Sequence, residues 1–215
     1  MLGDAYLYPN GTLQIEHGID QAAYVYWKYE VLKALVGKEP KVVRRADGRT
    51  GKIYCSVRFY TRAVLKEFRS LFYAEGRKVV PEEIAEMLDP LALAVWFMDD
   101  GGRGAHTPKG LVINTSCFSV EEQSVLQEAL AKRFGIETSV HKVGEGWQLY
   151  VKARSFVRFC EVVGPYLLVE MKRKLPVDPV TTSQSEMVVA DRRGQIYGHH
   201  KTSALVFETA DEVKV

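Results

Sequence analysis

The stretch Leu93-Ala94-Val95-Trp96-Phe97-Met98-Asp99-Asp100-Gly101-Gly102 decides the fold that we expect for this chain of 215 residues. Its apolar residues predict a helix from Pro90 to Met98, which ends in the acidic and glycine residues. A carboxylate at such an end, among small residues, allows a second helix to pack closely and bring a second acid beside it. Two carboxylates that share a site repel each other, so this arrangement is reasonable mainly when divalent cations lie between them.

A second motif of this kind, Leu2-Gly3-Asp4-Ala5, stands at the start of the sequence, where we also expect a helix end. Asp4 and Asp100 are 96 positions apart, and Lys78 and Lys174 are separated by the same 96 positions. Each lysine precedes a proline by a few residues. The equal offsets support an internal repeat, and the order of the predicted elements supports it more strongly.

That order is the same after both motifs. In the first half we expect a strand pair around Pro9-Asn10-Gly11, a helix capped by Asp20 and ended by Gly37, hairpin arms 41–45 and 52–60, and a helix over 64–72. In the second half we expect a strand over 111–118, a helix from the capping box of Ser119 and Glu122 to Gly135, hairpin arms 138–143 and 147–152, and a helix over 156–167.

The predicted fold class is therefore α+β, with two pseudo-symmetric αββαββα repeats. Residues 1–81 form the first repeat, with most of its motif helix absent, and residues 82–176 form the second. Residues 177–215 are a polar tail of unclear role, with β-like stretches such as Ser203 to Phe207. A hydrophobic content of 47% is sufficient to bury one shared core.

Composition excludes several other classes of protein. No signal sequence and no apolar run long enough to span a bilayer are recognisable, so we expect a soluble, intracellular protein whose compartment, cytoplasmic or organellar, is not resolved. Cys55, Cys117 and Cys160 are widely spaced and flanked by apolar residues, which favours reduced, buried thiols. No cysteine or histidine pair, including His199 and His200, has the surroundings of a zinc site.

The net charge of +2 conceals a strong segregation along the chain. Residues 38–78 hold twelve Lys or Arg against four Asp or Glu, which is +8, so the remainder carries about −6. A basic face of this kind is expected where a protein meets a polyanion, although a merely solvated basic surface is an equal alternative on charge alone.

Alternation within the predicted strands favours nucleic acid. Polar and apolar residues alternate from Lys52 to Tyr60, so one face of the strand is apolar and the other presents cationic, hydroxyl and aromatic groups. Such groups can contact phosphates and base edges if the sheet lies in the major groove. The residues that we predict to contact DNA are Gln14, Glu16, Lys41, Arg44, Arg45, Lys52, Tyr54, Ser56, Arg58, Tyr60, Asn114, Ser116, Lys142, Gln148, Tyr150 and Lys152.

The two acidic motifs resemble those of single-chain LAGLIDADG homing endonucleases, and the resemblance extends over about residues 1–176. It implies a saddle of two antiparallel sheets with the motif helices at its centre. It also implies that Asp4 and Asp100 bind metal, with Asp99 and Gly3 beside the metal, and that Lys78 and Lys174 are the basic residues of the active site. The expected cofactor is Mg²⁺, two or more ions shared between the motifs.

The function implied by the resemblance is cleavage of both strands of a long double-stranded DNA target, across the minor groove, to leave 3′ overhangs. Because both motifs lie in one chain, we expect a monomer. The resemblance further implies that the protein is encoded within an intron. Met1 lies so close to Asp4 that most of the first helix is absent. An RNA maturase that acts on its host intron, or a DNA-binding protein without cleavage activity, is therefore the alternative. A generic scaffold without a nucleic-acid partner would require the basic strand faces to be incidental.

Overall fold

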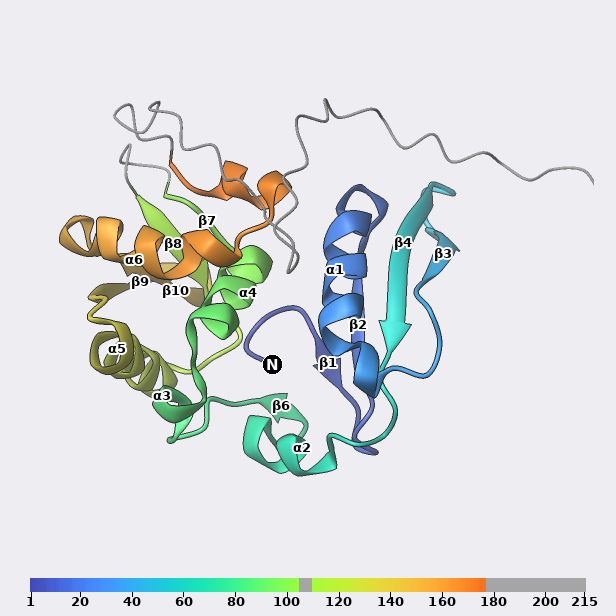
Figure 1. The fold of residues 1–215 in the computed structure, drawn as a ribbon, viewed down its shortest axis with the longest axis horizontal. Coiled ribbons are helices and arrows are strands. Elements are labelled where there is room, and N and C mark those ends of the chain that lie inside the picture. The colour runs from blue at the N-terminus through green and yellow to red at the C-terminus, as the bar shows by residue number, and fades with distance from the viewer. Residues whose placement is uncertain (105–109, 177–215) are drawn as a thin grey trace, which may run out of the picture. The chain divides into compact units, whose positions relative to one another are not determined.

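The computed structural model describes residues 1–104 and 110–176, and residues 1–177 group into one compact unit. The β-like stretch predicted at Ser203 to Phe207 lies outside the described residues. Two four-stranded antiparallel sheets of the same topology dominate this unit, which confirms the predicted α+β class with two repeated halves (Figure 1).

The first sheet has the strand order β1-β2-β4-β3. Its strands are β1 (Tyr6–Leu7), β2 (Leu13–Gly18), β3 (Lys41–Ala46) and β4 (Ile53–Tyr60). Helix α1 (Ala22–Leu32) packs on the apolar side of β2 and β4, where Ile15, Val57 and Phe59 are buried. The alternation in the sequence therefore predicts this sheet correctly, because one face is covered by a helix and the other is not.

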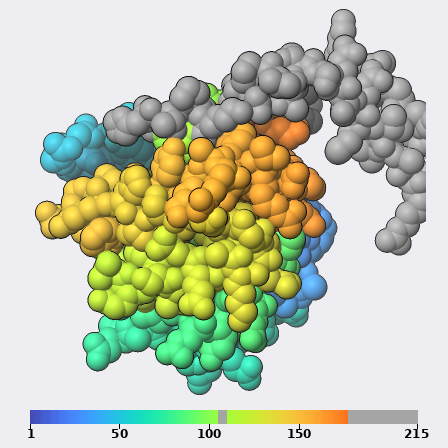
Figure 2. Space-filling view, turned by 90° about the vertical axis from the view of Figure 1, so that its left-hand side faces the viewer, coloured from blue at the N-terminus to red at the C-terminus, as the bar shows by residue number. Residues whose placement is uncertain are grey.

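The second sheet repeats this plan with the order β7-β8-β10-β9. Its strands are β7 (Gly101–Arg103), β8 (Leu111–Asn114), β9 (Thr138–Val143) and β10 (Gly146–Val151). Helix α5 (Val120–Phe134) packs on its strands β9 and β10, and α6 (Phe156–Val163) packs against α4 and α5; Figure 2 shows the outer face of this half. The predicted capping box of Ser119 and Glu122 is confirmed, and Gly135 ends α5 in the left-handed conformation with φ 69°.

Helix α4 (Pro90–Asp100) lies between the two halves in Figure 1 and carries the acidic motif at its end. The side chain of Asp89 caps it by accepting a hydrogen bond from the Ala92 N–H, and Pro90 occupies its first turn. Leu93, Ala94 and Phe97 are fully buried. Because β7 begins at Gly101, the chain passes directly from the end of the helix into the second sheet.

The helix predicted over 64–72 is confirmed as α2 (Lys66–Phe72). It leads into elements that the sequence did not predict, a small hairpin of β5 (Tyr73–Ala74) and β6 (Arg77–Lys78) and then α3 (Ile84–Met87). Glu122 anchors this connection to α5, since its carboxylate accepts hydrogen bonds from the Val80 N–H and from Arg77. The hairpin fixes where Lys78 lies. Short 3-10 turns complete the described residues at Ile19–Gln21, Lys33–Leu35, Ala153–Ser155, Gly164–Tyr166 and Val169–Lys174.

The helix end predicted at Leu2-Gly3-Asp4-Ala5 is wrong, since none of residues 1–5 is helical. The Asp4 N–H instead donates a hydrogen bond to the side chain of Asp99. An apolar cavity of about 280 Å³ lies between residues 1–3, α1 and α4, and Trp27, Val95 and Trp96 line part of it.

Three further expectations need local correction. Asp20 makes no helix cap, because α1 begins only at Ala22, after a short 3-10 turn. Strand β8 ends at Asn114 instead of 118, because Ser116 turns back to bond the Asn114 side chain. The last helix ends at Val163, where the 3-10 turn of Gly164–Tyr166 begins.

The expectation of buried thiols is also wrong, because Cys117 is exposed and Cys55 and Cys160 are only half-buried.

Candidate functional site

Asp4 and Asp100 lie at equivalent places in the two halves, each just before the first strand of its sheet. The Asp4 side chain is 48% exposed, whereas Asp100 is half-buried at the end of α4. Burial, together with the negative charges of Asp4 and Asp99, raises the pKa of Asp100 to about 7. Among the residues that the structure describes, no cationic or hydrogen-bonding group pairs with the Asp100 carboxylate. Like charges are therefore gathered around Asp100, and the positive charges of Lys78 and Lys174 offset their effect on its pKa only in part.

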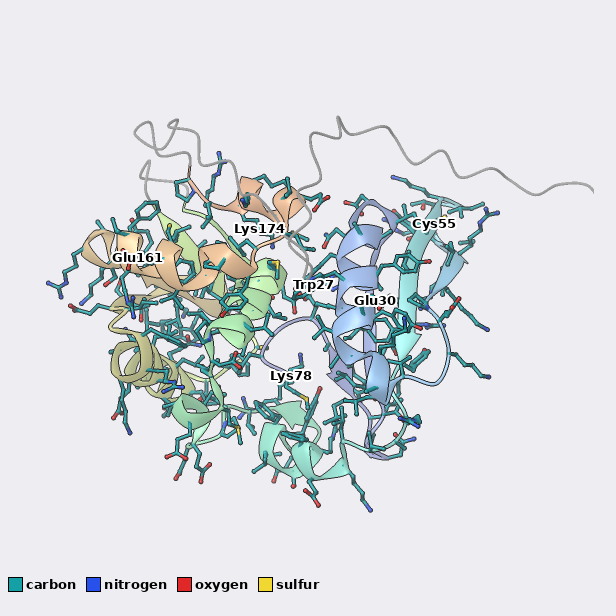
Figure 3. The ribbon with its side chains drawn as sticks, viewed as in Figure 1. Trp27, Glu30, Cys55, Lys78, Glu161 and Lys174 are labelled. Atoms are coloured by element: carbon teal, nitrogen blue, oxygen red, sulfur yellow. The ribbon has the colours of Figure 1, made fainter. Side chains whose placement is uncertain are left out.

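Lys78 and Lys174 approach these acids from the two halves and point toward the centre of the molecule (Figure 3). Lys78 Nζ donates a hydrogen bond to the carbonyl oxygen of Gly3 at 2.5 Å. Lys174 Nζ donates to the carbonyl oxygens of Met98 at 2.5 Å and Asp99 at 3.0 Å. Burial lowers the pKa of both ammonium groups. The structure thus brings the two predicted lysines together with the two acidic motifs.

Asp99 is buried in a polar network that crosses between the halves. Its side chain is 3% exposed, and its Oδ1 accepts hydrogen bonds from Lys28 Nζ at 2.6 Å and from the Tyr24 hydroxyl at 2.8 Å. Its Oδ2 accepts a hydrogen bond from the backbone N–H of Asp4 at 3.2 Å. The buried ring of His17 adjoins this network, with Nε2 3.1 Å from Lys28 Nζ.

Asp4, His17 and Asp99 form a group that is able to hold a metal ion, since one ligand atom of each lies within 4.8 Å of the others. His17 Nδ1 is 3.7 Å from the Asp4 carboxylate, and its Nε2 is 3.8 Å from that of Asp99. Burial and then the charge of Lys28 lower the pKa of His17, which favours the neutral ring that ligates metals. Carboxylate oxygens are the donors that hard divalent cations prefer, but the Lys28 ammonium already lies against Asp99 Oδ1 and His17 Nε2.

The polar face of the first sheet collects most of the residues predicted there. Strand pairing places Gln14 opposite Tyr60, Glu16 opposite Arg58, Lys41 opposite Arg58 and Arg45 opposite Tyr54. Partners in an antiparallel pair point to the same side, and Ser56 also lies on this face, opposite Val43. Lys52 precedes the strand and lies over the Tyr54 ring, with Nζ 5.3 Å from the ring centre.

Glu16 organises this face as its central acceptor. Its carboxylate accepts hydrogen bonds from Ser56 at 2.5 Å, Arg45 at 2.7 Å and Gln14 at 3.0 Å, and it lies 3.5 Å from Arg58. Although burial raises the pKa of Glu16, the hydrogen bonds from Ser56 and Arg45 outweigh it and hold that pKa below its usual value. The basic side chains are thereby held in place around one negative charge.

Arg44 is not brought together with this group. It pairs with Cys55, so it points to the side of the sheet that carries Val57 and Phe59. Lys142 differs in the same way, because it pairs with Trp147, on the side of Leu149. A one-residue step along a strand reverses the side on which a residue lies.

The polar face of the second sheet is smaller. Strand pairing brings Gln148 between Asn114 and His141, and Tyr150 beside Ser139. The His141 and Tyr150 rings stack with their centres 5.3 Å apart. Ser116 lies in the turn after β8, and Lys152 follows β10, where its Nζ is 3.4 Å from Glu137.

Sequence reasoning missed His141 and Ser139 on the second sheet, and His17, Lys28 and Tyr24 at the centre. Strand alternation was the available signal for Ser139 and His141. Both lie on the same side of the sheet as Gln148 and Tyr150, which are their partners in β10. No local pattern marks Lys28, since it lies in a helix and its partner Asp99 is 71 positions away.

Comparisons with known proteins agree with this arrangement. The profile of the LAGLIDADG DNA endonuclease family matches residues 1–159. The chain therefore belongs to the LAGLIDADG DNA endonuclease family. The homing endonuclease I-WcaI, solved bound to its DNA recognition sequence, has the same fold, with a TM-score of 0.73 and 26% identity over 81% of each chain.

Two relatives have different described roles. Cytochrome b mRNA maturase bI2 of Debaryomyces hansenii is 34% identical over 140 residues, which are 63% of this chain and 52% of that protein. Intron-encoded endonuclease ai4 of Dictyostelium discoideum is 32% identical over 121 residues, 55% of this chain and 74% of that protein. The chain thus spans about half the length of the maturase. Within the described residues, no helix has the length and apolarity needed to cross a membrane.

Proposed function

We propose that this chain is a metal-dependent, site-specific endonuclease that hydrolyses both strands of a long double-stranded DNA target and leaves 3′ overhangs. The observation that carries the proposal is the matched pair of acids and lysines at the centre. Asp4 and Asp100 each end a motif, and Lys78 and Lys174 bind the carbonyl oxygens of Gly3 and Asp99, the residues just before those acids.

The carboxylates of Asp4 and Asp100 would hold Mg²⁺, two or more ions shared between the motifs, with the Gly3 backbone beside them. When bound, such ions activate a water and stabilise the charge that develops on the scissile phosphate. The raised pKa of Asp100 fits this role, because burial and the repulsion from Asp4 and Asp99 both disfavour its negative charge, and a bound cation would offset both. Lys78 and Lys174 add positive charge beside the same phosphates.

The two polar sheet faces would bind the DNA. Arg58, Lys41 and Arg45 would contact phosphates or base edges from the first sheet, and Gln148, Asn114 and Tyr150 from the second. Because one chain contains both halves of the site, a monomer is sufficient for cleavage. The segregated positive charge of residues 38–78 supports binding to a polyanion.

The test begins with selection of a cleavable duplex from a randomised DNA library. Purified protein should then cut that duplex in Mg²⁺ and not in EDTA, and Asp100→Asn should bind it without cutting. Normal cutting by Asp100→Asn would overturn the assigned roles. A library in which no duplex is cut in Mg²⁺ would overturn the endonuclease itself.

A maturase that assists splicing of its host intron is the second candidate, and the 34% identity to the Debaryomyces maturase favours it. The same basic faces would then contact intron RNA. A splicing assay with the host intron, run beside cleavage of the joined exons, separates the two candidates. Splicing without cleavage would favour the maturase.

A further inference from the structure

We propose that Asp99 is a positioning residue, whose buried ion pair with Lys28 holds the backbone of Gly3 and Asp4 and so places the Asp4 carboxylate. This inference rests on the proposed function, because it concerns how one of the two proposed metal ligands is placed. On this inference Asp99 positions Asp4 and does not itself contact the metal.

The first step is an asymmetry between the two halves. The offset of 96 positions that relates Asp4 to Asp100 also relates Gly3 to Asp99. These two positions meet, because a Cβ added to Gly3 would lie 2.2 Å from Asp99 Oδ2. Glycine on one side therefore makes room for a carboxylate on the other. The two motifs differ at this position because the residues occupy one shared space.

The second step is the use of both oxygens of Asp99. Oδ1 accepts from Lys28 Nζ at 2.6 Å, and Oδ2 accepts from the Asp4 N–H at 3.2 Å. The Lys28 side chain is 6% exposed, and its Nζ lies 4.2 Å from the centre of the Tyr24 ring. An ammonium at this distance competes with any divalent cation for Oδ1. The carboxylate is thus already neutralised by a buried partner.

The third step is the difference in support between the two proposed ligands. Asp100 is the last residue of α4, so hydrogen bonds within the helix hold its backbone. Residues 1–5 have no helical hydrogen bonds, and Asp4 is held through Asp99 Oδ2 and through Lys78 on the Gly3 carbonyl. The position of Asp4 therefore depends on Asp99, whereas that of Asp100 does not.

The closing experiment compares Asp99→Asn, Lys28→Met and the double variant in the full chain. If Asp99 acts through the ion pair, either single change slows cleavage of one strand about 10- to 100-fold, because displacement of a reacting group by about 1 Å has that effect. Both changes should affect the strand that Asp4→Asn affects. The double variant should be no slower than either single variant, since the two residues act as one unit.

A direct metal ligand gives the opposite result for Lys28→Met. Removal of the competing ammonium would then tighten binding of Mn²⁺, measured by titration calorimetry without DNA, while Asp99→Asn would weaken it. That pair of results would overturn the proposal. Equal weakening by both variants supports it. Lys33→Met is the matched control, because Lys33 lies at the exposed end of the same helical region, where its ammonium pairs with Glu30 and lies over the Tyr29 ring.

A readout without metal or DNA separates this inference from the proposed function. In NMR spectra of the free protein, the Asp4 amide should shift and exchange faster with solvent in both single variants, while the exchange rate of the Asp100 amide, which α4 protects, is unchanged. Each single variant leaves one buried charge without its partner, which destabilises the fold by itself. The double variant has neutral groups at both positions, so exchange of its Asp4 amide is measured without that effect. An Asp4 amide unchanged in all three would overturn the positioning role, even if the wild-type chain cleaves DNA. If the amide shifts but no DNA is cut, only the endonuclease assignment fails.

Discussion

Lys78 and Lys174 stand 96 positions apart and donate hydrogen bonds to the carbonyl oxygens of Gly3 and Asp99, which are themselves 96 positions apart. The two lysines come from different local structures, since one ends a short hairpin and the other ends a 3-10 turn. Their ammonium groups nevertheless reach equivalent atoms. The repeat is therefore preserved most closely at the positions where we propose the chemistry.

Replacement of either lysine should slow cleavage while leaving DNA binding intact. Lys78→Met and Lys174→Met each remove a positive charge beside the scissile phosphates, so we expect a loss of about 100-fold in single-turnover cleavage. Affinity for the duplex should change by less than about threefold, because a single phosphate contact contributes little to a large interface. Full-rate cleavage by either variant would remove that lysine from the active site.

Asp100→Asn should stabilise the metal-free protein at neutral pH. The pKa of Asp100 in the folded chain is about 7, above its ordinary value of 3.8, so the folded state binds a proton that the unfolded state releases. The ionised carboxylate therefore lowers stability, and the loss grows as pH rises from 3.8 toward 7. The variant should raise Tm more at pH 8 than at pH 5.5. For a chain of this size, each 1 kcal/mol of added unfolding free energy raises Tm by about 2–4 °C. An equal gain at both values would contradict the proposed repulsion.

Cleavage by the wild-type chain should depend on pH through the same group. At limiting Mg²⁺, the rate should fall as pH drops below about 7, because a protonated Asp100 is a poor ligand. Raising the Mg²⁺ concentration should move the midpoint to lower pH, since metal and proton compete for one carboxylate. The check is a series of pH–rate profiles at several Mg²⁺ concentrations. A midpoint that does not move would assign the titration to another group.

The elements that follow from local chemistry could be predicted from the sequence. The capping box of Ser119 and Glu122 acts within one helical turn, and the alternation in β4 is a property of the strand alone. The ion pair of Lys28 and Asp99 could not be predicted, because it depends on how α1 packs against α4. The same is true of Arg44, whose side of the sheet is set by pairing with Cys55 and not by its neighbour Arg45.

Arg44 and Arg45 provide the sharpest test of the DNA-binding face, because they are adjacent and point to opposite sides of the first sheet. Arg45 lies among Glu16, Ser56 and Arg58, whereas Arg44 faces away from them. If the polar face contacts phosphates, Arg45→Ala should weaken binding and reduce the slope of log K against log salt concentration by about 1. Arg44→Ala has the same change in net charge and should leave the slope unaltered. Fluorescence anisotropy of a labelled duplex at several salt concentrations measures both variants, and equal effects would mean that only net charge matters.

The pair Lys142→Ala and Gln148→Ala extends the test to the second sheet, where Gln148 lies on the polar face and Lys142 does not. A loss of target discrimination in Gln148→Ala alone would extend the proposed interface across both halves of the chain.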